Sequence, residues 1–187
     1  QSLDQNTTAS NNTAVGYHAG YANTASYLAA VGYRALTSNT TGAQNTAMGY
    51  EAGVTNTTGG NLSAFGLQAG YSNTTGSSNT FIGANAARAN STGSYNAAIV
   101  GNQAGYNNTT GALNTALGGS SLLANTTGTA NVAVGRSALG SNTTASHNTA
   151  VGYQSLLSNT TGASNTGLGN YALFSNTTAS NNTAVGY

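Results

Sequence analysis

The chain has 187 residues but only five formal charges, and it contains 26 glycines and no cysteine, proline or tryptophan. An ordinary globular domain carries about a quarter of its residues as charged side chains, against 3% in this chain. Without cysteine, disulfide frameworks and thiolate metal sites are excluded, and three basic residues argue against a phosphate-binding surface. No apolar run approaches the roughly 18 residues of a membrane-spanning helix. This composition favours a repetitive structural material over an enzyme.

A glycine that follows a large apolar residue recurs along the whole chain with a period of 17 residues. One interval is shorter by one residue (Gly16 to Gly32) and one is longer by one (Gly83 to Gly101). Helical repeats of 33 to 47 residues and leucine-rich repeats of 20 to 29 residues do not fit this period. We therefore expect a single repeat array over residues 1–187. Its coil cores lie at Gly16, Gly32, Gly49, Gly66, Gly83, Gly101, Gly118, Gly135, Gly152, Gly169 and Gly186.

Each repeat predicts a short strand followed by turns. The segment Thr-Ala-Val-Gly-Tyr alternates with period two, as a strand does, and Asn-Thr-Thr-Gly is typical of a turn. We expect an all-β fold, a β-solenoid (parallel β-roll) of about eleven 17-residue coils, with two short strands and two turns per coil and about 4.8 Å between coils. Arg34 and Glu51 share one position in successive coils, so we expect them to form a surface ion pair.

The residue before each glycine is always large and apolar, as at Val15, Phe65 and Ile82, so we expect it to point into the interior. The small residue before it, as at Ala14 and Ala47, is then expected to form a face that a second chain can approach closely. Because the few apolar side chains of one coil barely offset the entropy of ordering it, we expect lateral association, most simply a threefold bundle.

An asparagine followed by Thr or Ser recurs seven residues after each glycine, and two interpretations of it stay open. Most of these triplets match the acceptor motif for N-linked glycosylation. Alternatively, the asparagines point inward and form a hydrogen-bonded ladder, which their presence in every coil favours. The candidates are Asn6, Asn39, Asn56, Asn73, Asn90, Asn108, Asn125, Asn142, Asn159 and Asn176.

Tyr17, Tyr33 and Tyr50 occupy one position in consecutive coils. They are interpreted either as a strip packed within the fibre or at a chain interface, or as an exposed aromatic strip that binds sugars or a surface. The threonine pairs of the turns raise a further alternative, an ice-binding array.

Residues capable of acid–base chemistry are few and do not cluster. His18 and His147 fall at different positions of the repeat, and Asp4 lies about three coils from Glu51, which is too far for a cooperating pair of carboxylates. We expect no catalytic, cofactor-binding or metal site, no nucleic-acid partner, and no membrane insertion within this segment.

The unit Asn-Thr-Ala-Val-Gly-Tyr-x-Ala, recurring every 17 residues, resembles the head repeats of trimeric autotransporter adhesins. It is also similar to Asn-Thr-Thr-Gly-rich repeats of phage tail fibres and bacterial surface fibres. The resemblance implies a left-handed parallel β-roll that is trimeric, lies outside the cell and serves attachment.

Residues 6–17 and 176–187 have the same twelve-letter sequence, so we expect the array to continue in a longer chain or by end-to-end stacking of chains. The sequence therefore predicts a non-enzymatic structural or adhesive filament. It would be the shaft of a cell-surface fibre or of a phage tail fibre, and it would self-associate as a trimer or end to end. A binding module, for ice through threonines or for glycans through the tyrosine strip, is the alternative.

Overall fold

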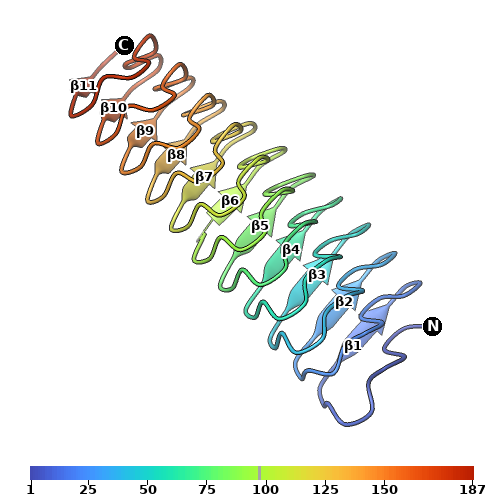
Figure 1. The fold of residues 1–187 in the computed structure, drawn as a ribbon. Helices are drawn as coiled ribbons and strands as arrows, with labels where there is room; N and C mark the ends of the chain where they lie inside the picture. Colours follow the sequence, from blue (N-terminus) through green and yellow to red (C-terminus); the bar gives the residue numbers. More distant parts are fainter. Residues whose placement is uncertain (97) are drawn as a thin grey trace.

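The computed structural model describes residues 1–96 and 98–187, and these form one elongated β-solenoid with the two termini at opposite ends (Figure 1). Each coil contributes one three-residue strand, and the strands pair in parallel in chain order to give one 11-stranded sheet along the rod. The solenoid expected from the repeat is confirmed, and no helix occurs among the described residues. The strands are β1 (Thr13–Val15), β2 (Ala29–Val31), β3 (Thr46–Met48), β4 (Ser63–Phe65), β5 (Thr80–Ile82), β6 (Ala98–Val100), β7 (Thr115–Leu117), β8 (Val132–Val134), β9 (Thr149–Val151), β10 (Thr166–Leu168) and β11 (Thr183–Val185).

The expectation of two strands per coil is wrong. After each glycine the chain curls, because the second and fourth following residues have positive φ, as in Glu51 (φ 52°) and Leu36 (φ 50°). A residue in this left-handed region cannot continue an extended strand. Backbone hydrogen bonds nevertheless join this side of the coils, as from Leu36 N to Ala52 O at 3.0 Å.

The interior is lined by the central residue of each strand. This residue is alanine in most coils and is buried, whereas the residues on either side of it point outward, as the pleat of a strand requires. The expectation that Val15, Phe65 and Ile82 point inward is therefore wrong, and so is the expectation that the alanine face is outermost. The central position faces the interior in every strand, and it holds a larger buried residue in two of them, Phe81 and Ile99.

The remaining core volume is filled from one of two sides. Where the fourth residue after the glycine is leucine, as at Leu139 and Leu156, that side chain fills the coil and is fully buried. Where it is glycine, a large residue on the opposite side packs against it: a Cβ on Gly70 would lie 2.7 Å from the Phe81 ring. This exchange keeps the cross-section constant, as a close-packed interior demands.

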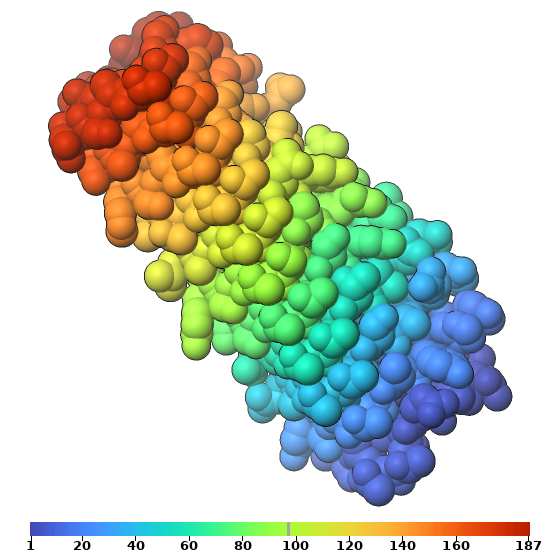
Figure 2. Space-filling model, in the orientation of Figure 1, coloured from blue at the N-terminus to red at the C-terminus, as the bar shows by residue number. Residues whose placement is uncertain are grey.

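The glycine that ends each strand is required by both its conformation and its neighbours. Gly118 has φ +138°, and a Cβ on it would lie 2.6 Å from the backbone carbonyl of Gly135 in the next coil. The successive coils therefore stack in direct backbone contact and form a continuous rod (Figure 2).

Candidate functional site

The asparagine in the turn of each coil points into the solenoid and forms a ladder along it. Each side-chain Nδ2 donates to the Oδ1 of the equivalent asparagine in the preceding coil, at 2.6–3.3 Å, without a break from Asn23 to Asn176. The same Nδ2 donates to a carbonyl three residues onward, as from Asn125 to Gly128 at 3.0 Å. Asn39, Asn56, Asn73, Asn90, Asn108, Asn125, Asn142 and Asn159 are buried.

A second asparagine, just before the strand, forms another set of contacts between coils. In Asn114, for example, Oδ1 accepts from the backbone N of Asn131 at 3.0 Å and Nδ2 donates to Gly128 O at 2.9 Å. An asparagine stands directly before most of the strands in the sequence, but this role was not predicted for it. The signal was its recurrence in most coils, since a position that only opens a strand tolerates many residues.

This geometry bears directly on the glycosylation motifs. An N-linked sugar is attached through Nδ2, and in the buried asparagines that atom already donates two hydrogen bonds inside the coil. Of the ten candidate positions, only Asn6 and Asn176 are partly exposed. Asn6 bonds to Ala9 within its own turn. The folded chain therefore presents the other eight amides to its own neighbours rather than to solvent.

The paired threonines of the turns divide into two columns with different surroundings. The first hydroxyl of each pair donates to a carbonyl of the next coil, as from Thr40 to Thr57 O at 3.0 Å and from Thr126 to Thr143 O at 3.0 Å. The second threonine is exposed in every coil that carries it from the third onward. This outer threonine column consists of Thr41, Thr58, Thr75, Thr92, Thr110, Thr127, Thr144, Thr161 and Thr178.

The tyrosine strip is exposed, but its rings stack on one another. The ring centroids of Tyr17 and Tyr33 are 5.5 Å apart, and those of Tyr33 and Tyr50 are 5.1 Å apart, with nearly parallel planes. His18 covers the other face of Tyr17 at 4.0 Å. Tyr17 and Tyr33 each stack with two rings, so they offer ring edges and hydroxyl groups to solvent, whereas Tyr50 stacks with one ring.

A second aromatic cluster lies near the C-terminal end, where Tyr171 contacts Tyr153, Phe174 and Tyr187. Desolvation, followed by charge repulsion from Tyr153 and Tyr187, raises the pKa of Tyr171. A tyrosine hydroxyl is already protonated at neutral pH at its ordinary pKa, so this rise leaves its charge unchanged there.

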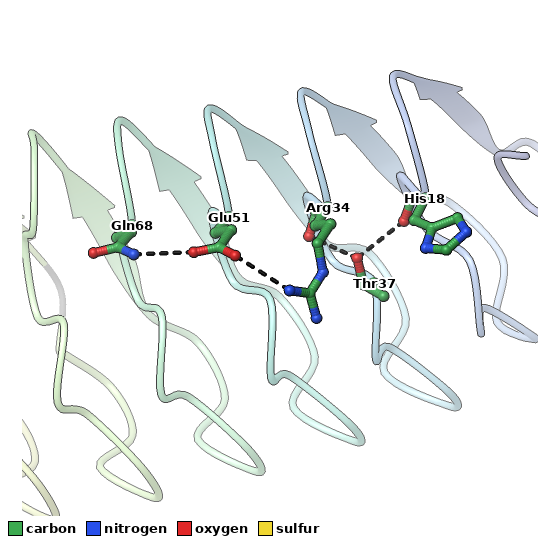
Figure 3. Close-up of polar contacts among 5 residues, drawn as sticks. All are labelled: His18, Arg34, Thr37, Glu51 and Gln68. Carbon is green, nitrogen blue, oxygen red and sulfur yellow. Dashed lines mark hydrogen bonds and ion pairs between the residues drawn. The ribbon is translucent and has the colours of Figure 1, made fainter.

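Charged groups form one short polar chain across successive coils (Figure 3). The predicted Arg34–Glu51 pair is confirmed at 3.3 Å, and the other carboxylate oxygen of Glu51 accepts from Gln68 Nε2 at 3.0 Å. Gln68 in turn accepts from Arg88 Nε at 3.0 Å. The Arg34 side chain is 41% exposed, so the ion pair contributes at most about 1 kcal/mol to stability.

The residues considered for catalysis are not brought together. His18 packs against Tyr17 and Tyr21, His147 is exposed in another coil, and Asp4 is exposed and bonded to Gln5. Among the described residues there is no cluster of three or more metal-ligating side chains and no pocket. The described part of the chain also lacks a helix long and apolar enough to cross a membrane.

The most extensive feature of the surface is a line of large apolar residues, which we call the apolar column. Each is the third residue of its strand, and most are more than a third exposed, including Leu117 at 39% and Met48 at 50%. The column runs from the first strand to the last. Its members are Val15, Val31, Met48, Phe65, Ile82, Val100, Leu117, Val134, Val151, Leu168 and Val185.

No family model, curated protein or solved structure matches the chain.

Proposed function

We propose that this chain is a structural fibre shaft built from stacked solenoid coils. The observation that carries the proposal is the direction of its hydrogen-bonded columns. The sheet, the asparagine ladder and the inner threonine hydroxyls all join one coil to the next along the long axis. Repeating the same contact from coil to coil produces a long, stiff rod, and it does not gather reactive groups into a single site.

The shaft would be extended by further coils of the same kind. The first and last strands of the sheet, β1 and β11, each have a strand neighbour on one side only, and an open parallel edge pairs readily with a strand of matching register. We propose that copies of this chain stack end to end through these two edges and so continue the coils into a filament.

The setting we propose is outside the cell, on a cell surface or in a virion fibre, with attachment as the purpose of the fibre. Its support is the resemblance of the repeat unit Asn-Thr-Ala-Val-Gly-Tyr-x-Ala to adhesin and tail-fibre repeats.

Electron microscopy of the native material, combined with fibre diffraction, tests the shaft. We expect an unbranched filament with an axial repeat of about 4.8 Å, and labelling by antibodies against this chain at the outer surface of cells or virions. A compact particle without that repeat would refute the proposal.

Ice binding is a second candidate because of the outer threonine column. Its nine members are exposed at one per coil, and the described part of the chain gives their hydroxyls no hydrogen-bond partner. Ice grown in the presence of the chain should develop facets if this column binds it. A variant with Thr75, Thr110 and Thr144 replaced by lysine would serve as the control, and unfaceted growth with the unmodified chain would exclude this candidate.

A further inference from the structure

The apolar column presents a conflict between sequence and exposure. All eleven strands carry a large apolar residue at their third position, with no exception. Other positions with so little variation are explained within the chain: the glycine by backbone contact, the turn asparagine by its ladder. A side chain on the surface of a lone coil has no such constraint, since polar residues would suit water better.

We infer that the apolar column is the interface through which copies of this chain pack side by side. This inference rests on the proposed shaft and names its lateral partner. A position that is apolar in every coil and exposed in the single chain is explained if the column is buried between chains, as the core of a larger assembly.

A second copy of this chain fits the apolar column better than an unrelated partner, because the column residues repeat with a fixed spacing. The column repeats once per coil along the whole rod, so a partner that covers it throughout must carry the same period. A copy of this chain has that period. Charge repulsion does not oppose the packing of two copies, since Arg136 is the only charged residue among the three outward positions that form this face. Those positions are the first and third residues of each strand and the residue after the glycine.

The size of the face is close to what a specific interface needs. In the strand direction the face spans four residue steps, from the first strand residue to the residue after the glycine, or ~13 Å. Along the rod it spans ten inter-coil steps, or ~48 Å. The flat footprint is therefore on the order of 600 Å², and the accessible surface that follows the side chains is larger. Stable protein interfaces bury about 800 Å² on each partner.

Sedimentation of the 187-residue chain tests the inference with two matched variants. In the column variant, Met48, Ile82 and Leu117 are replaced by asparagine. In the control variant, three apolar residues that are 59–62% exposed elsewhere on the coil are replaced in the same way: Tyr27, Tyr95 and Leu113. The control positions have positive φ, which asparagine tolerates.

We expect the unmodified chain and the control variant to sediment at no less than twice the 18.4 kDa monomer mass. The column variant should sediment as the monomer while keeping the circular dichroism spectrum of the unmodified chain. A monomeric unmodified chain, or a column variant of unchanged mass, would overturn the inference.

A single cysteine gives a readout that does not depend on the folding of the column variant. Val100 is the sixth of the eleven column residues, so it faces its own counterpart whether two aligned rods run parallel or antiparallel. The chain has no cysteine of its own. Under mild oxidation Val100→Cys should form a covalent dimer, whereas Leu113→Cys should not.

Equal cross-linking of the two cysteine variants, or none with Val100→Cys, would overturn the lateral interface. Micrographs then separate this failure from failure of the shaft. A filament made of single unpaired rods removes the interface and leaves the shaft, whereas a compact particle removes the shaft itself.

Discussion

Replacing Asn125 by alanine tests whether the asparagine ladder stabilises the solenoid. Asn125 is 1% exposed, and its Nδ2 donates to Asn108 Oδ1 at 2.7 Å and to Gly128 O at 3.0 Å. Its own Oδ1 accepts from Asn142 Nδ2 at 2.8 Å. The substitution removes all three hydrogen bonds and cuts the ladder in the middle of the rod.

The expected cost follows from the groups left without a partner. Gly128 O keeps a hydrogen bond from Asn114, so it is not orphaned. Asn108 Oδ1 loses its only donor among the described residues, and one N–H of Asn142 loses its acceptor. Each unsatisfied buried group costs about 1–3 kcal/mol, so we expect Asn125→Ala to lower the local free energy of unfolding by about 4 kcal/mol.

Native-state amide hydrogen exchange is the suitable assay, because a repeat array opens coil by coil rather than all at once. Protection should fall in the coils that contain Asn108, Asn125 and Asn142 and remain elsewhere. Asn176→Ala is the matched control: Asn176 is partly exposed at the end of the ladder, so water can replace its bond and the cost should be about 1 kcal/mol or less. Equal losses of protection for the two variants would refute the structural role of the ladder.

Four further outcomes are expected. Gly118→Ala should destabilise by about 3 kcal/mol because of its positive φ and its backbone contact, whereas the adjacent Gly119→Ala, whose Cβ would meet nothing closer than 3.9 Å, should be neutral in thermal unfolding. Phe81→Ala should lower the free energy of unfolding by about 3–5 kcal/mol, because it empties the core. Phe65→Ala, on the outer face, should lower it by less than about 1 kcal/mol; urea titrations of dilute protein measure both. In Asn125→Asp, burial and the facing amide oxygen should raise the pKa of the new carboxyl above its unfolded value. The melting temperature of that variant should then be higher at pH 3 than at pH 7 and fall as pH rises through the folded pKa, whereas a pH-independent difference from the unmodified chain would contradict this. Finally, intact mass spectrometry of native chains should show no N-linked sugar at the buried asparagines, and a sugar on any of them would contradict the ladder.

The repeat architecture could be predicted from the sequence because the period is explicit. The strand positions and the stacking of Arg34 over Glu51 follow once residues are aligned by their glycines. The number of strands per coil could not be predicted. The positions that curl the chain are occupied by residues as different as Glu51 and Leu36, and neither residue type indicates a positive φ.

The direction of the apolar column was the main error, and its cause is physical. A repeated pattern shows that a position avoids water, but it does not show whether the covering atoms belong to the same chain or to another. Alternation within a strand leaves two faces to choose from. Only the narrow interior, which accepts Ala116 but leaves Leu117 outside, decides between them.

The alignment of the inter-coil hydrogen bonds with the long axis has a mechanical consequence. A pull on the two ends loads the contacts between coils in series, so the coil with the weakest contacts opens first while the others hold. Each released coil of 17 residues extends by roughly 50 Å, since it changes from a rise of about 4.8 Å to an almost straight chain. A rod of this kind would lengthen about tenfold in discrete steps under tension and would dissipate work at each step.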